Sequence, residues 1–204
     1  MKMEQLSKIT DQMKSICQIE LEGKKGTGFF CNFSVPNKHA YVHALITNNH
    51  LINENTLQKG IPINIGINNN SENRTINIKN DRKVYASREY DITIIEITEK
   101  DGINNFLELD ENIYNSHLLE KSNIYFLYYL GDNNTSNFSS GMIKRIEGNR
   151  ILHDCSSGIG SSGGPLLSLN TNKVIGIHIG SMKHKNLNFG NLLNQAVSEF
   201  LNNY

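Results

Sequence analysis

The sequence has few of the features that mark secreted, membrane or nucleic-acid-binding proteins. Among its 204 residues only three are cysteines, Cys17, Cys31 and Cys155, which lie far apart and form no CxxC pair. We therefore expect small buried thiols in a reducing compartment, and neither a disulfide framework nor a zinc site. Lys+Arg and Asp+Glu both number 20. This balance gives no electrostatic reason to expect nucleic acid or an anionic membrane as a partner.

Long apolar runs are also missing. None approaches the roughly 18–20 residues that a membrane span needs. The segment 1–15 carries acidic and polar residues where a secretory signal would need an apolar core. We therefore expect a cytoplasmic location.

Short apolar or alternating runs, separated by polar turns, dominate the chain and predict an all-β fold. Long helices between strands are absent, which argues against a doubly wound α/β sheet. The predicted strands are 15–21, 28–33, 40–47, 61–67, 74–78, 91–97, 123–130, 141–146, 150–153, 165–169 and 173–180. The predicted helices are 3–13, with a weak apolar face, and 192–201, with a strong one. The predicted connections are 68–73, 101–121 and 132–140, the last long enough to be mobile.

The segment GIGSSGGPLL, Gly158 to Leu167, combines two adjacent serines with glycines on both sides. Glycine crowding of this kind either marks an ordinary turn or directs backbone N–H groups toward a reacting atom. Acyl transfer by a serine also needs a base within hydrogen-bond reach and a group that orients the base. The choice between the two interpretations therefore depends on residues elsewhere in the chain.

Two earlier segments supply such residues. In ITNNHLI, His50 follows an apolar strand, and imidazole is the side chain best matched to proton transfer near neutral pH. In YDITIIEI, Asp91 stands at the head of an apolar strand, where its carboxylate needs a hydrogen-bond donor. Taken singly, His50 is more often structural and Asp91 more often a turn residue. The three segments together outweigh the three separate structural interpretations.

The chain resembles the trypsin-like (chymotrypsin-fold) serine peptidases, and most closely their HtrA-like and glutamyl-endopeptidase-like branches. The matching pieces run from about Lys25 to Leu193: KGTGFF, ALITNNHLI, YDITIIEI, HDCSSGIGSSGGPLL, KVIGIHIG and NFGNLL. The resemblance implies a catalytic triad of His50 as base, Asp91 as its orienting carboxylate and Ser162 as nucleophile. It also implies an oxyanion hole formed by the N–H groups of Gly160 and Ser162.

The resemblance further implies a fold of two six-stranded antiparallel β-barrels with a C-terminal helix. Residues 1–112 would form the barrel half that carries His50 and Asp91. Residues 113–204 would form the half that carries Ser162 and ends in the amphipathic helix. The implied activity is that of a serine endopeptidase that acts on peptides or proteins through an acyl-enzyme, without metal or cofactor.

One departure from the family pattern concerns activation. Many secreted members hold an aspartate before the nucleophile, which pairs with a new N-terminus after cleavage, whereas this chain has Ser161. A neutral hydroxyl forms no such ion pair, which argues against activation by N-terminal insertion. The loop 158–162 must then be ordered in another way. The hypothesis from the sequence is that an activating partner protein or the substrate orders it.

The resemblance assigns Ser157, His178 and Gly180 to the primary specificity pocket. A protonated His178 would favour Glu or Asp at P1, the substrate residue before the scissile bond. The alternative is a histidine satisfied by neighbouring backbone. Basic P1 residues are disfavoured, because Ser156 or Ser157 falls where an aspartate would be needed.

Two other functions are alternatives to the peptidase. A catalytically weak trypsin-like domain could bind peptides by strand addition or act in signalling, although the complete triad argues against it. An esterase of the α/β-hydrolase type would need the histidine after the serine in the chain. Here His50 precedes Ser162, so this interpretation fails.

Overall fold

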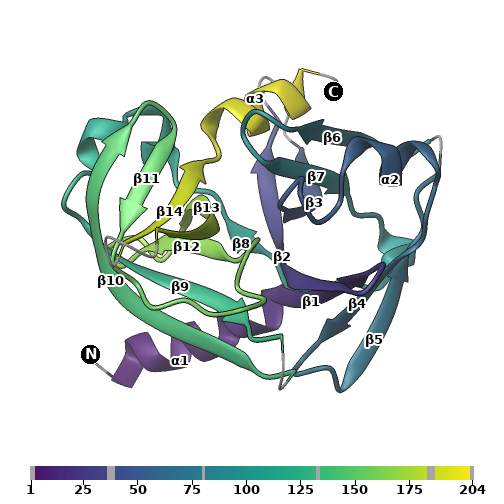
Figure 1. Ribbon diagram of the computed structural model, residues 1–204, viewed down its shortest axis with the longest axis horizontal. Coiled ribbons are helices and arrows are strands. Elements are labelled where there is room, and N and C mark those ends of the chain that lie inside the picture. Colours follow the sequence, from purple (N-terminus) through teal and green to yellow (C-terminus); the bar gives the residue numbers. More distant parts are fainter. Residues whose placement is uncertain (1–2, 36–39, 80, 132–133, 183–186, 203–204) are drawn as a thin grey trace.

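The protein, described by a computed structural model over residues 3–35, 40–79, 81–131, 134–182 and 187–202, is built from two β units (Figure 1). The strands of the first unit are β1 (Ile16–Leu21), β2 (Lys24–Ser34), β3 (Tyr41–Thr47), β4 (Ile63–Ile67), β5 (Glu72–Ile76), β6 (Val84–Ser87), β7 (Ile92–Glu96) and β8 (Leu107–Glu108). Those of the second are β9 (Asn123–Tyr129), β10 (Ser136–Glu147), β11 (Arg150–His153), β12 (Pro165–Ser168), β13 (Val174–Met182) and β14 (Leu187–Leu192).

The second unit is a closed six-stranded antiparallel barrel with the order β10-β11-β14-β13-β12-β9. This unit confirms the prediction of a six-stranded barrel. The first unit differs from the prediction: it is an eight-stranded sheet of order β5-β4-β1-β2-β3-β7-β6, with β8 parallel to β2. Within the described ranges, β5 and β6 do not pair with each other. Both strands are short and half exposed, so they are suited to sheet edges.

In the described part of the chain, three α-helices accompany the strands: α1 (Met3–Gln12), α2 (Glu54–Gln58) and α3 (Asn194–Leu201). The sequence predicted α1 and α3 but not the short α2, whose N-terminus is capped by the Asn53 side chain. None of the helices in the described ranges is long and apolar enough to cross a membrane. Short 3₁₀ turns at Glu99–Asp101, Glu111–Tyr114 and Ser116–Leu118 occupy the predicted connection 101–121.

Several sequence-based predictions need correction. Residues 136–140, predicted as part of a mobile loop, form the first half of β10 and pair with Tyr125–Tyr129 of β9. The apolar β9 supplies a partner edge, which fixes strand structure even in a polar Ser/Asn segment. The strands β6, β8 and β14 were missed because they are short or interrupted by polar and glycine residues.

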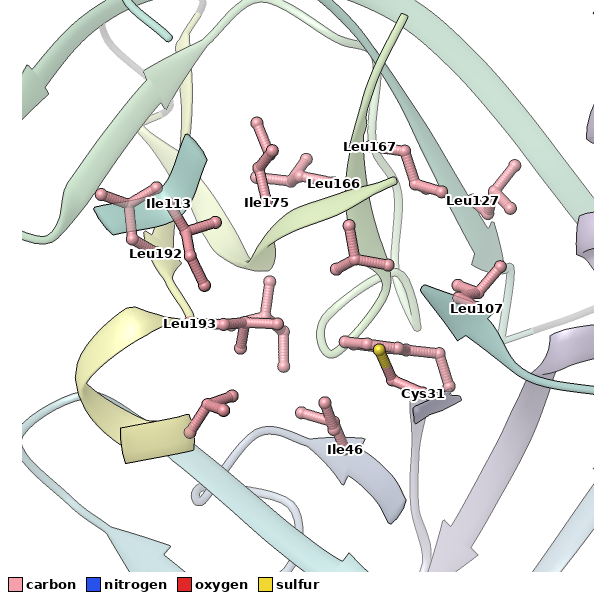
Figure 2. Close-up of a cluster of buried hydrophobic side chains, with 14 of the residues drawn as sticks. Cys31, Ile46, Leu107, Ile113, Leu127, Leu166, Leu167, Ile175, Leu192 and Leu193 are labelled. Carbon is pink, nitrogen blue, oxygen red and sulfur yellow. The ribbon is translucent and has the colours of Figure 1, made fainter. Parts of the chain in front are cut away.

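A shared hydrophobic core joins the two units. Figure 2 shows Cys31 and Ile46 of the first unit near Leu193, which leads into α3, with Leu127, Leu166 and Leu167 of the second barrel beyond them. The helix α3 contributes Phe200, whose ring meets Phe33 of β2 edge-on at a centroid distance of 6.1 Å. The chain thus returns to the first unit at its end (Figure 1), which holds the two units in a fixed relation.

Candidate active site

Strand pairing brings His50 and Asp91 together. The strands β3 and β7 are antiparallel neighbours, with Thr47 opposite Thr93. His50 lies in the turn that follows β3, and Asp91 lies in the turn that precedes β7. Because the strands are antiparallel, the two residues lie at the same edge of the sheet, next to each other.

Two hydrogen bonds join these residues. The His50 Nδ1 atom lies 2.6 Å from Asp91 Oδ2, and the His50 backbone N–H donates to Asp91 Oδ1 over 2.8 Å. A carboxylate only accepts hydrogen bonds when ionised, so Nδ1 carries the proton and Nε2 keeps its lone pair. The His50 side chain is 50% exposed and Asp91 20% exposed. The imidazole thus presents a basic nitrogen on the side away from its less exposed partner.

Asp91 adopts a left-handed backbone conformation, with φ of 51°, which is uncommon for a residue other than glycine. Its surroundings hold it there. The Asn48 side chain donates from Nδ2 to the Asp91 carbonyl over 2.9 Å. From β14 of the other unit, Asn191 Nδ2 donates to the carbonyl of Tyr90 over 2.7 Å. Both units therefore fix the segment that carries the carboxylate.

The loop of residues 158–162, called the nucleophile loop below, distinguishes its two serines. Ser161 is 2% exposed, and its hydroxyl donates to the Gly158 carbonyl over 2.6 Å within the turn. Ser162 is partly exposed, and its hydroxyl donates to the Ile179 carbonyl over 2.9 Å. Although both residues are described, no hydrogen bond joins Ser162 to His50. Ser162 is therefore the accessible serine, and its hydroxyl must rotate before it can meet a base.

Gly26 of β2 lies between the His50 segment and Ser162. A Cβ atom at Gly26 would stand 2.6 Å from Leu51 Cδ2 and 3.3 Å from the Ser162 carbonyl oxygen. Because Gly26 has no side chain, Leu51, which follows His50, and the backbone of Ser162 can both pack closely against β2 at this glycine. The segments carrying His50 and Ser162 thus meet at the boundary of the two units.

Two N–H groups of the nucleophile loop have no acceptor. Among the described residues, none accepts a hydrogen bond from the backbone N–H of Gly160 or of Ser162. The carbonyls of the same two peptide groups are engaged: that of Ile159 accepts from Gly131 N over 2.9 Å, and that of Ser161 accepts from Gly164 N over 3.2 Å. Two free donors beside a partly exposed serine are the arrangement that an anionic oxygen requires.

The residues predicted for the specificity pocket lie on β13 and on the segment that follows β11. The Ser157 hydroxyl donates to Asn188 Oδ1 over 3.0 Å. The pairing of β13 with β14 shifts register between His178 and Gly180. A Cβ atom at Gly180 would lie 3.5 Å from the Phe189 ring. His178 is 1% exposed and lies against the Phe126 ring at a centroid distance of 4.6 Å.

Behind His178 lies a second buried histidine that the sequence analysis missed. His153 of β11 is fully buried, and its Nε2 atom lies 3.3 Å from Nδ1 of His178. Burial lowers the pKa of both imidazoles, and the His153 charge would lower the pKa of His178 further. Burial therefore disfavours the protonated form of both imidazoles in the free protein.

A cavity of about 430 Å³ opens beside His50, between α2 and β6. Its charged lining residues are Glu54 and Arg88, in addition to Asp91 of the His50 pair. No salt bridge of the described residues involves Glu54 or Arg88. This hollow is large enough for a side chain of a bound peptide.

Three residues beside the site, Thr27, Asn48 and His153, lie in motifs of the family resemblance, but the sequence predicted no role for them. Thr27 lies in KGTGFF, Asn48 in ALITNNHLI and His153 in HDCSS. All three are 0% exposed in the structure. Their burial is a property of the fold, so no local sequence signal distinguishes them from ordinary polar residues.

Comparisons with known proteins agree with this fold. The protease Rv3671c of M. tuberculosis, in an inactive form, is similar with a TM-score of 0.67 and 15% identity over 94% of this chain and 89% of its own. A human pathogenic astrovirus serine protease gives 0.62 and 18% over 88% and 89%. A serine endoprotease of Yersinia pestis gives 0.69 and 14% over 99% and 68%.

A search of curated proteins finds no significant match to the sequence. Residues 26–177, in contrast, match the family model of the trypsin-like peptidase domain. This match covers most of the chain and includes His50, Asp91 and Ser162. The HtrA-like and glutamyl-endopeptidase-like branch stays a prediction. The chain belongs to the trypsin-like peptidases and has the chymotrypsin-like fold of that family.

Proposed function

We propose that this protein is a serine endopeptidase that uses His50, Asp91 and Ser162 as its catalytic triad. The observation that carries the proposal is the pair of hydrogen bonds from His50 to Asp91, at 2.6 and 2.8 Å, which leaves Nε2 as a base. A histidine without this partner would present either tautomer. The family match supports peptide bonds as the substrate.

The reaction begins when the Ser162 hydroxyl turns from the Ile179 carbonyl toward His50 Nε2. His50 takes the proton while Ser162 Oγ attacks the scissile carbonyl carbon, and the carbonyl oxygen becomes an anion. The N–H groups of Gly160 and Ser162 then donate to this oxygen. Protonated His50 gives its proton to the leaving amine, and the acyl-enzyme remains. Water then attacks the ester while His50 takes one of its protons, and His50 passes this proton to Ser162 Oγ as the bond between Oγ and the acyl carbon breaks, which releases the acid product and restores the serine hydroxyl.

The test is cleavage of fluorescein-labelled casein and of a mixed peptide library by the wild-type protein and by Ser162→Ala. The proposal predicts cleavage within peptide chains by the wild type and none by the variant. Equal cleavage by both proteins would show that a contaminating protease is responsible and would remove the support for Ser162.

The second candidate is a peptide-binding module with little catalysis. The observation that favours it is the hydrogen bond from Ser162 to Ile179, which holds the hydroxyl away from His50. The same library separates the two functions. If the protein is a binding module, the wild type and Ser162→Ala should bind the same peptides equally well, and neither should cleave them.

For the primary specificity pocket we propose Ser157, His178 and Gly180, with Glu or Asp preferred at P1. Because burial lowers the pKa of His178 in the free protein, a substrate carboxylate must raise the pKa of this imidazole on binding. Cleavage after Glu and Asp should therefore strengthen relative to other residues as the pH falls from 8 to 6. A library that shows no enrichment of Glu and Asp at pH 6 would contradict this preference.

We further propose a reducing compartment such as the cytoplasm and no nucleic acid or membrane among the partners. Cys17, Cys31 and Cys155 are all free and buried. Burial raises the pKa of each thiol, which keeps the thiols protonated and unreactive. Isolation of the native protein with any of these cysteines oxidised to a disulfide would contradict the compartment.

A further inference from the structure

Thr27 of β2 makes three hydrogen bonds at the boundary of the two units. Its hydroxyl donates to the Gly160 carbonyl over 2.9 Å and accepts from the backbone N–H of Tyr129 over 2.9 Å. Its own backbone N–H donates to the Ser162 carbonyl over 2.8 Å. The residue is 0% exposed. One buried residue of the first unit thus binds two carbonyls of the nucleophile loop, that of Gly160 through its side chain and that of Ser162 through its backbone N–H.

These bonds bear on the two free N–H groups of the loop. A peptide group is planar, so its N–H and C=O point in opposite directions. The Ile159 carbonyl is held by Gly131 N, which sets the direction of the Gly160 N–H, and the Ser161 carbonyl is held by Gly164 N, which sets that of the Ser162 N–H. Between these two peptide groups lies the peptide group that contains the Gly160 carbonyl.

Gly160 is the flexible point of the loop, with a φ of +90° that glycine tolerates and other residues rarely adopt. Rotation of the peptide group between Gly160 and Ser161 would change this conformation and turn the neighbouring N–H groups. The Thr27 hydroxyl binds the carbonyl of that very peptide group. Its second bond, to Tyr129 N, ties the same hydroxyl to the end of β9, next to Gly131.

We infer that Thr27 is a positioning residue that holds the Gly160 and Ser162 N–H groups in the orientation needed to bind an oxyanion. This inference rests on the proposed function. It replaces the hypothesis that a partner or substrate orders the loop, because the loop is held by the chain's own buried hydroxyl. It also accounts for the absence of a charge at Ser161: the neutral Thr27 side chain does the positioning that an ion pair would otherwise do.

The test compares Thr27→Val, Thr27→Ser and the wild type in their rate of phosphonylation by a fluorophosphonate probe. Valine has the shape of threonine without the hydroxyl, and serine keeps the hydroxyl. Phosphonylation needs both the base and donors for the phosphoryl oxygen. We expect Thr27→Val to react about 10- to 100-fold more slowly, below the loss for an oxyanion donor removed outright. Thr27→Ser should recover most of the wild-type rate.

One control variant and two further measurements separate positioning from a structural role. Ser168→Ala removes another buried hydroxyl of the second barrel, one that accepts from the N–H groups of Asn170 and Thr171. It should lower stability while its phosphonylation rate stays within about twofold of wild type. In hydrolysis of p-nitrophenyl acetate, Thr27→Val should lower kcat with little change in KM. The low-field proton NMR signal from the His50–Asp91 hydrogen bond should persist in the Thr27→Val variant.

If the valine side chain prevents folding, Thr27→Ala removes the hydroxyl without adding a methyl group beside the Gly160 carbonyl. Phosphonylation of folded Thr27→Val or Thr27→Ala at the rate of the wild type would overturn the inference. A low rate in Thr27→Ser equal to that of Thr27→Val would also overturn it. An unreactive wild type would instead refute the proposed function itself, so the two failures are distinguishable.

Discussion

Asp91 binds His50 at two points, through the imidazole Nδ1 at 2.6 Å and through the backbone N–H at 2.8 Å. One carboxylate therefore fixes both the tautomer of the ring and the turn that carries it. The side-chain bond selects the imidazole nitrogen that carries the proton, and the backbone bond fixes the position of the His50 main chain from which the ring extends. This double contact makes the carboxylate the element on which the candidate site depends most.

Replacing Asp91 by asparagine should keep the shape of the site and reverse its proton assignment. The asparagine amide can donate to Nδ1, which would move the imidazole proton to Nε2 and remove the base. We expect a fall in kcat of about 10⁴-fold, the size seen when a triad carboxylate is replaced in this way. Steady-state hydrolysis of a peptide found in the library measures it. A loss smaller than about tenfold would contradict the role of Asp91.

Asn48 offers a test of how the carboxylate is held. Asn48→Ala removes the donor to the Asp91 carbonyl and leaves that carbonyl without its bond. We expect a loss of about 1–2 kcal/mol in the free energy of unfolding, together with a kcat about tenfold lower. Urea unfolding and peptide hydrolysis measure the two effects.

Asn49→Ala is the matched control for this variant. Asn49 is also buried, but its Nδ2 donates to the Thr93 hydroxyl, at 3.3 Å, and makes no bond to Asp91. It should lower stability with a much smaller effect on kcat. Equal losses of kcat in the two variants would show that Asn48 has no special relation to Asp91.

The buried histidine pair predicts a pH dependence of stability. In the unfolded chain histidine has a pKa of about 6.5, whereas burial lowers the pKa of His153 to about 4 and also lowers that of His178. Between these values the unfolded state binds more protons, so stability falls as the pH falls through 6.5. From pH 7.5 to 5 the loss should be roughly 2 kcal/mol for each histidine.

Urea unfolding at the two pH values measures this loss, and His153→Gln provides the control. With one titrating group removed, the loss between pH 7.5 and 5 should fall to about half. The prediction fails if wild type and variant lose the same free energy on acidification, because the buried pair would then not be the source.

Gly163 tests the close contact between the units. Its φ is +90°, and a Cβ atom there would lie 2.0 Å from the Thr27 carbonyl oxygen. Gly163→Ala combines backbone strain with a clash, so we expect at least about 3 kcal/mol of destabilisation and loss of activity. Gly148→Ala is the control, because Gly148 has a φ of +60° and no neighbour within 4 Å of a Cβ atom. It should cost only about 1–2 kcal/mol; similar costs at both sites would contradict the clash.

The sequence predicted the residues that meet at the site better than the bonds that hold them. His50 and Asp91 could be found because each stands at the end of an apolar run, and Ser162 because of the glycines around it. Thr27 and Asn48 could not be found in this way. Their roles depend on where one hydroxyl or amide points, across strands that are distant in the chain.

The fold shows the same division between local and long-range information. The apolar segments 15–21 and 123–130 predicted strands that the structure confirms, within one residue at one end, as β1 and β9. Residues 136–140 are polar, and only their pairing with β9 makes them a strand. Closure of a sheet is equally non-local, so the open edge strands of the first unit could not be read from its strand pattern.

The central claim is tested most directly by fluorophosphonate labelling of the purified protein, followed by mass mapping of the modified peptide. The account predicts a single modified residue, Ser162, in the wild type and no label in Ser162→Ala. Ser161→Ala should still be labelled at Ser162, because the Ser161 hydroxyl only binds Gly158 within the turn. A folded wild-type protein that takes no label, or takes it at Ser161, would contradict the account.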